Sequence, residues 1–351
     1  MSKVRRGARQ RRLVAPVVAA AFLASVITAT AVPASVTTTA ARPPRGPSHG
    51  IPVAGATASG TYQGPCRVAA AAEFARWRGQ PNGVIVDTLD LRRWSTLASP
   101  TWWTACWGRG APVVYGVAMV MGEGGSLASG AAGAQDATYR ALARTLVAGG
   151  QAHAWLRLGF EFNGSWYPWR AAADPAAFAS FYRRIVTVMR SVPGAAFRYV
   201  WNPTLGAEAF PAEKAWPGNA YVDAIGLDVY DVSYAPGTYP IPDGSSASAV
   251  KERHEAAWRH YRTMDHGLDW WARYARQRHK PLALPEWGLV PRHHHGGGDN
   301  AVFIERLSTW MKHRPLAFES YFDAIGALGD HRLRSGQYPR AAQRYRERFG
   351  R

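Results

Sequence analysis

Cysteine is scarce in this 351-residue sequence, which contains only Cys66 and Cys106. Two thiols cannot by themselves supply the four ligands of a structural zinc site. In an oxidising compartment they would form one disulfide, and otherwise they would be two free buried thiols. We expect the disulfide and keep the free thiols as the alternative.

Acidic residues are also few, because 24 Asp and Glu stand against 42 Lys and Arg, for a formal net charge of +18. Such a charge could attract nucleic acid or anionic polymers of the cell envelope. The arginines, however, are scattered among Trp and Ala and do not form one stripe. We therefore expect a basic surface without a nucleic-acid partner.

Charge is absent between Leu13 and Val32, an apolar run that follows six basic residues. This pattern predicts a signal peptide over residues 1–34, with cleavage near Val32-Pro33-Ala34 and a secreted product of charge +12. An uncleaved membrane anchor is the alternative, since the run is about long enough to span a bilayer. Arg11-Arg12 hints at twin-arginine export. After cleavage no stable membrane association is expected.

Residues 35–58 are rich in Ala, Thr, Pro and Gly and lack hydrophobic periodicity, which predicts a disordered linker. Residues 59–351 are expected to form one folded domain. The composition supports a globular core, because 47% of the residues are hydrophobic and 19% are charged.

Short apolar segments alternate with amphipathic segments along this domain, as in a parallel sheet with crossover helices. The expected strands are 60–63, 83–89, 112–119, 154–161, 197–202, 224–230, 281–286 and 321–326. The expected helices are 69–78, 136–147, 175–192, 250–278 and 301–313. No Gly-x-Gly-x-x-Gly follows any of these strands, which disfavours a dinucleotide-binding fold. Eight units favour an α/β fold of the (β/α)8 TIM-barrel type.

Two glutamates lie where such a barrel carries its chemistry, at the carboxyl ends of strands. Glu161 ends the fourth expected strand and is followed by Phe-Asn-Gly-Ser-Trp-Tyr-Pro-Trp, and Glu286 ends the seventh. Burial against aromatic groups can keep one carboxyl protonated while hydrogen bonds keep the other ionised. Glycoside hydrolysis requires that division of labour.

From about Ser59 to the C-terminus the chain resembles glycoside hydrolase family 26, one of the clan of barrel glycosidases. The resemblance rests on Arg157 to Trp169, Val200-Trp201-Asn202-Pro203, Ile225 to Asp231 and Leu284-Pro285-Glu286-Trp287-Gly288. It implies a retaining hydrolase of β-linked polysaccharide, mannanase-like and endo-acting, that needs no cofactor or metal.

The resemblance also implies individual roles. Glu161 would be the general acid/base and Glu286 the nucleophile, with the Tyr230 hydroxyl positioning Glu286. Trp166 would be a platform on which a sugar stacks, and Asp228 would belong to the sugar-binding shell.

Further residues near the strand ends are candidates for substrate contact. Aromatic residues are usually core, so packing is the alternative for each of them. Arg157 is expected inside the barrel, paired with Asp228 or with either glutamate. The remaining candidates are Asn163, Tyr167, Trp169, Trp201, Asn202 and Trp287.

One position departs from the family pattern. Mannan-cleaving members usually have His immediately before the acid/base, where this chain has Phe160. Phe cannot donate a hydrogen bond to the reacting sugar, so a β-glucan, a xylan or an envelope polysaccharide is the alternative substrate. A sugar-binding barrel without catalysis is the alternative outside the enzymes.

Two loops are expected near the cleft. The run His293-His294-His295 is not expected to bind a metal, because consecutive side chains alternate in direction. The segment 232–248, after the sixth strand, is expected to form one wall of the groove.

Overall fold

The protein forms a closed barrel of eight parallel strands, seen in a computed structural model that describes residues 57–206, 208 and 210–350. The strands follow one another around the ring in chain order. Their bounds are β1 Ala58–Tyr62, β2 Val84–Thr88, β3 Val113–Val117, β4 Trp155–Leu158, β5 Arg198–Trp201, β6 Ala224–Asp231, β7 Leu282–Leu289 and β8 Leu316–Phe322. The predicted (β/α)8 fold is therefore confirmed.

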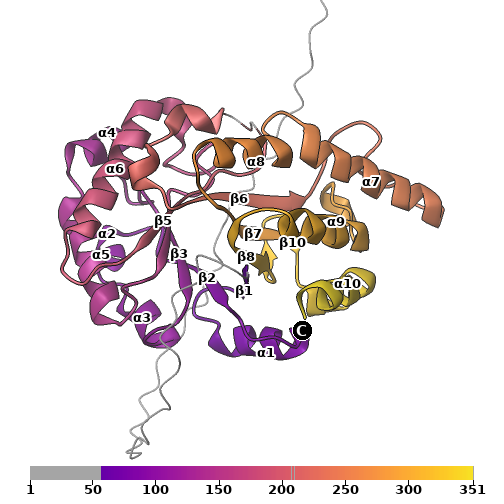
Figure 1. Cartoon of the computed structure of the whole chain (residues 1–351), viewed down its shortest axis with the longest axis horizontal. Helices are drawn as coiled ribbons and strands as arrows, with labels where there is room; N and C mark the ends of the chain where they lie inside the picture. The colour runs from indigo at the N-terminus through magenta and orange to yellow at the C-terminus, as the bar shows by residue number, and fades with distance from the viewer. Residues whose placement is uncertain (1–56, 207, 209, 351) are drawn as a thin grey trace, which may run out of the picture.

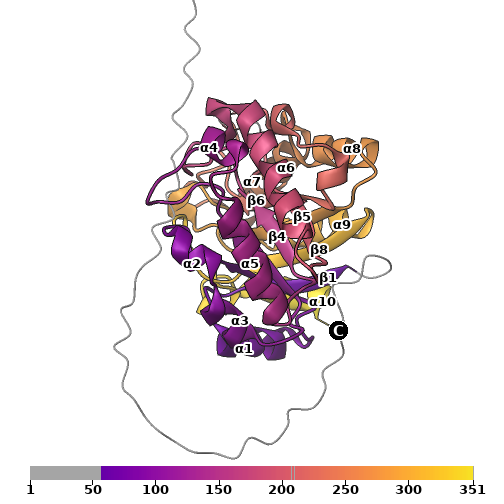
Figure 2. The same cartoon turned by 90° about the vertical axis from the view of Figure 1, so that its left-hand side faces the viewer.

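Helices surround the barrel on its outside (Figure 1). Their bounds are α1 Val68–Arg78, α2 Trp94–Ala98, α3 Thr101–Trp107, α4 Leu127–Ala132, α5 Asp136–Ala148, α6 Pro175–Arg190, α7 Ala247–Thr263, α8 Leu268–Gln277, α9 Ala301–Lys312 and α10 Pro339–Phe349. Figure 2 shows α5 and α6 side by side against the barrel wall. Helix α6 begins as expected at Pro175, and the Asp174 carboxylate caps it by accepting a hydrogen bond from the Ala177 amide at 2.8 Å.

Two apolar layers stabilise this arrangement. Alternate strand residues such as Val86, Trp155 and Phe318 fill the barrel interior. The residues between them point outward and pack under the helices, as Tyr115 and Trp201 do. Both faces of each strand are thus buried, which explains why the strand sequences are apolar on successive residues.

The eighth strand was expected at 321–326 and instead spans Leu316–Phe322. Glu319 interrupts its apolar sequence, yet its carboxylate is buried and accepts a hydrogen bond from the Trp287 indole at 2.6 Å. The two residues of β9 Ile325–Gly326 pair instead with β10 Gly329–Asp330 in a small antiparallel hairpin.

The single helix expected over 250–278 is also wrong, because α7 and α8 are separate. The chain leaves the helical conformation at Met264, where ψ is 165°, and His266 has a positive φ of 51°. The hydrophobic periodicity of the two helices continues across this break, and it therefore concealed the turn.

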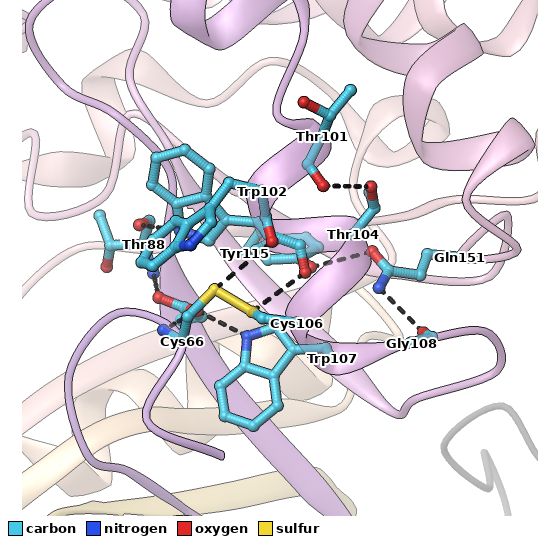
Figure 3. The surroundings of a disulfide bond; sticks show 12 residues. Cys66, Thr88, Thr101, Trp102, Thr104, Cys106, Trp107, Gly108, Tyr115 and Gln151 are labelled. Atoms are coloured by element: carbon cyan, nitrogen blue, oxygen red, sulfur yellow. Dashed lines mark hydrogen bonds between the residues drawn. A yellow bond between two sulfur atoms is a disulfide. The ribbon is translucent and has the colours of Figure 1, made fainter. Parts of the chain in front are cut away.

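Cys66 and Cys106 form a disulfide with their Cα atoms 5.8 Å apart, within the expected range (Figure 3). It joins the loop after β1 to helix α3. The predicted signal peptide and nearly all of the predicted linker lie outside the described residues. Within the described part of the chain, no helix is both long enough and apolar enough to cross a bilayer.

Candidate active site

Three carboxylates meet at the carboxyl ends of the strands. Glu161 follows β4, Asp228 lies in β6 and Glu286 lies in β7, and all three side chains are buried. Each offers an oxygen that lies within 4.8 Å of an oxygen from each of the others. The strand register explains part of this, because Asp228 and Glu286 are paired neighbours in the sheet.

Arg157 supplies the positive charge beneath this group. Its Nη2 lies 2.5 Å from Asp228 Oδ2, its Nη1 lies 3.5 Å from Glu286 Oε2, and its Nε donates to Asn202 Oδ1 at 2.6 Å. The guanidinium is 1% exposed, so its charge is barely screened by water. Because a cation already lies among the carboxylates, we interpret the group as an acid/base site and not as a metal centre.

The two glutamates have different surroundings. The Tyr230 hydroxyl donates to Glu286 Oε1 at 2.7 Å, so this carboxylate has both a donor and the nearby Arg157 guanidinium. Glu161 accepts one hydrogen bond, from the Trp166 indole to Oε2 at 2.8 Å. Burial, reinforced by the negative charges of Asp228 and Glu286, raises the pKa of Glu161 well above its usual range.

The backbone around Glu161 presents its carboxyl to the barrel mouth. Glu161 has a positive φ of 53°, and its amide donates to the Asn202 carbonyl at 2.7 Å, which fixes the turn after β4 to the end of β5. Gly164 allows the Trp166 ring to lie over the turn, since a Cβ there would meet the ring at 2.4 Å. The indole is thereby held against Glu161.

Phe160, which stands where mannan-cleaving members have His, is packed and not open to substrate. Its ring lies under the Arg157 guanidinium, 5.0 Å from centroid to Cζ, and contacts the Tyr167 and Trp169 rings. Gly116 in β3 makes room for it, because a Cβ there would lie 3.0 Å from the Phe160 ring. The Phe160 ring is therefore enclosed by protein side chains.

Several predicted site residues do reach the carboxylate cluster. Arg157, Glu161, Trp166, Asp228, Tyr230 and Glu286 are joined by the contacts above. Tyr167 is buried, and the charges of Glu161 and Glu286 act with burial to raise its pKa. Asn202 is also buried and holds Arg157, so it is a positioning residue.

Four residues that were predicted to contact substrate, Asn163, Trp169, Trp201 and Trp287, are fully buried and make contacts within the protein. Asn163 bonds the backbone of Thr204, and the Trp169 indole donates to the Phe160 carbonyl at 2.8 Å. Trp201 and Trp287 point away from the barrel axis. The sequence already indicates that Trp287 faces away from the site, since it directly follows Glu286 and successive strand residues face opposite sides.

Tyr62 is a candidate that the motifs did not indicate. It is the last residue of β1, is half-buried, and stacks on Phe322 with centroids 4.8 Å apart. The charges of Asp87 and Glu286 add to burial in raising its pKa. Its hydroxyl therefore lies in the field of Glu286.

Removing the charge of Arg157 should destabilise the fold strongly, because Asp228 would be left buried without its cation. We expect Arg157→Met to lower the free energy of unfolding by about 3–5 kcal/mol, as measured by urea denaturation. Arg184→Met, which breaks the partly exposed pair with Asp136, is the matched control and should cost less than about 1 kcal/mol. Equal losses in the two variants would contradict a structural role for the buried pair.

A comparison with known proteins finds one family profile that matches part of this chain. Residues 151–241 match the profile of glycosyl hydrolase family 26, and this segment contains Arg157, Glu161, Asp228 and Tyr230. A search among curated proteins finds no match.

Solved structures share the fold at low sequence identity. An endo-β-1,4-mannanase double mutant from Cellulomonas fimi is 19% identical, with a TM-score of 0.55 over 83% of this chain and 70% of that one. The catalytic domain of a family 26 endo-β-1,4-mannanase from Bacillus sp. JAMB-750 is 16% identical, with a TM-score of 0.54 over 84% and 87%. A family 26 β-mannanase from Bacteroides ovatus is 13% identical, with a TM-score of 0.52 over 83% and 87%. The expected resemblance to glycosyl hydrolase family 26 is therefore confirmed over residues 151–241, the segment that carries Glu161, and the solved structures share the barrel fold.

Proposed function

We propose that this protein is a secreted retaining glycoside hydrolase that cleaves β-linked polysaccharide, with Glu161 as general acid/base and Glu286 as nucleophile. The observation that carries the proposal is the approach of the two carboxyl groups, which have oxygens within 4.8 Å of each other. Retaining pairs lie about 5–5.5 Å apart, whereas inverting pairs need about 6.5–9.5 Å to admit a water molecule.

The proposed reaction has two steps. Protonated Glu161 gives its proton to the departing glycosidic oxygen while a Glu286 oxygen attacks the anomeric carbon, so that a glycosyl ester forms as the glycosidic bond breaks. Ionised Glu161 then takes a proton from water, the resulting oxygen attacks the same carbon, and Glu286 leaves as a carboxylate. The anomeric configuration is retained, and Glu161 ends protonated.

For the substrate we propose β-mannan, cleaved internally. The mannanases that share this fold support the choice, at 13–19% identity. Because Phe160 cannot donate a hydrogen bond to the reacting sugar, the second candidate is the same reaction on a β-glucan, a xylan or an envelope polysaccharide. A barrel that binds sugar without cleaving it is the candidate outside the enzymes.

A panel of polysaccharides tests the function directly. Purified protein incubated with linear β-1,4-mannan, β-1,4-xylan and mixed-linkage β-glucan should release reducing ends from mannan, with oligosaccharides of several lengths. Release of reducing ends from another glycan alone would contradict mannan as the substrate and would leave the proposed mechanism unchanged. Binding without release from any glycan would support the non-catalytic barrel.

The pH profile should depend on the Trp166 indole. Because Glu161 must be protonated to donate, kcat/KM falls as the pH rises through its pKa. The Trp166 Nε1–H stabilises the ionised form, so Trp166→Phe should raise that pKa further and move the basic limb to higher pH. Trp94→Phe, whose indole donates to the Gly124 carbonyl, should leave the limb unmoved. A basic limb unchanged in Trp166→Phe would contradict the assignment of that limb to Glu161.

Secretion follows as a proposal from the basic and apolar N-terminus, and the Cys66–Cys106 disulfide suits an oxidising compartment. N-terminal sequencing of protein collected outside the producing cells should begin near residue 35. Retention of the protein in the membrane fraction would favour the uncleaved anchor.

A further inference from the structure

Two large aromatic side chains are conspicuously exposed within the described chain. Trp102 is 55% exposed and Tyr234 is 49% exposed. Trp102 follows β2, in the first turn of α3, and Tyr234 lies just beyond the end of β6. Exposed aromatic faces of this kind match the apolar faces of pyranose rings.

Trp102 is held rigidly at the carboxyl ends of β1 and β2. Its carbonyl oxygen lies 3.8 Å from Cys66 Sγ of the disulfide, and its ring packs edge-on against Trp103 at 4.9 Å (Figure 3). The Trp103 indole donates to the carbonyl of Thr88, the last residue of β2, at 3.1 Å. A covalent bond and a strand end thus fix the backbone beneath the exposed ring.

Asp87 strengthens this support. Its Oδ2 accepts from the Cys66 amide at 3.0 Å and from the Trp107 indole at 2.6 Å. One buried carboxylate therefore joins the loop after β1, the end of β2 and helix α3. The side chain of Trp102 loses little freedom when a ligand covers it, because its surroundings are already ordered.

Tyr234 has a comparable support on another side of the mouth. Its ring packs at a tilt against the His295 ring, with centroids 4.4 Å apart and an interplanar angle of 33°. The Ser233 amide donates to the His295 carbonyl at 3.1 Å. Val232 and Gly296 form an isolated antiparallel β-bridge. The loop after β6 is thereby tied to the loop after β7, the strand that carries Glu286.

The strands that precede these two side chains lie on opposite sides of the ring. Strands β2 and β6 are four strands apart in either direction around the closed ring. The strands that lead to Glu161 and Glu286, β4 and β7, lie between them on the two remaining sides.

We propose that Trp102 and Tyr234 are outlying sugar-stacking platforms of one cleft, each of which binds a pyranose ring of the same polysaccharide chain on its side of the cleaved bond. The proposal rests on the proposed function and deepens it, because a chain held on both sides is cleaved at internal bonds. It assigns no role to either residue in the chemical step.

Cleavage and binding are measured in separate experiments, and cleavage comes first. Trp102→Ala and Tyr234→Ala should each raise KM for β-1,4-mannan by about tenfold, the loss expected for one aromatic stack, and the double variant should raise it further. kcat/KM on an aryl β-mannoside, whose single sugar ring would leave both proposed platforms empty, should not change. The matched controls Trp102→Phe and Tyr234→Phe keep an aromatic face and should retain most of the affinity.

Affinity electrophoresis in gels that contain linear β-1,4-mannan, xylan or mixed-linkage β-glucan separates this inference from the function. Glu286→Gln, which cannot turn over substrate, should be retarded by at least one of these glycans, and adding Trp102→Ala should relieve that retardation. Unchanged retardation by the alanine variants, while the wild type still cleaves the glycan, would overturn the platforms alone. If the alanine variants relieve the retardation but the wild type cleaves none of the glycans, the platforms are supported and the proposed hydrolase activity is contradicted.

Discussion

Glu286→Ala is expected to lose about 10⁴-fold or more in kcat on every substrate, including aryl glycosides with good leaving groups. No leaving group replaces the nucleophile, so the glycosyl ester cannot form. The measurement is steady-state release of an aryl alcohol together with release of reducing ends from polysaccharide.

Azide should restore part of the activity of Glu286→Ala. The shortened side chain leaves space beside the anomeric carbon, and an azide ion that enters there attacks from the side that Glu286 used. One displacement inverts the configuration, so the product should be the glycosyl azide of opposite anomeric form, identified by proton NMR. A glycosyl azide of retained configuration would contradict the assignment of Glu286 as nucleophile.

Glu161→Ala is expected to separate substrates by their need for a proton. Hydrolysis of polysaccharide should fall by about 10²–10⁴-fold, the usual contribution of a positioned general acid. The first step on an activated aryl glycoside should survive, because its leaving group departs without a proton. Since hydrolysis of the intermediate then lacks its base, a burst of aryl alcohol should precede a slow steady state.

Azide should rescue this variant by attacking the glycosyl ester and should give a product of retained configuration. Equal losses on activated and natural substrates, with no burst and no rescue, would indicate that Glu161 has only a structural role.

The sequence was sufficient for the features that depend on local pattern. Apolar strands at regular intervals predicted the barrel. Glu161 and Glu286, which end the fourth and the seventh expected strand, were predicted to lie close together, and they have oxygens within 4.8 Å of each other. Arg157 was expected to find a carboxylate, and Asp228 is the partner it binds most closely.

Features that depend on tertiary packing were harder to predict. The Trp residues after strand ends looked alike in the sequence, yet Trp166 reaches Glu161 whereas Trp169 turns into the core. The difference arises from the turn at Gly164, which local propensity does not specify. The true start of β8 at Leu316 was missed, because Glu319 interrupts its apolar sequence and the partner of this carboxylate, the Trp287 indole, lies 32 residues away in the chain.

Mass spectrometry of the trapped intermediate tests the central claim most directly. Glu161→Ala, incubated with an activated aryl β-mannoside and stopped in acid during the slow phase, should carry one added glycosyl group. Digestion should locate that group on the peptide that contains Glu286, and fragmentation should assign it to the Glu286 side chain. A glycosyl group attached to Asp228 or to any other residue, or a burst of aryl alcohol with no covalent adduct, would contradict the proposed mechanism.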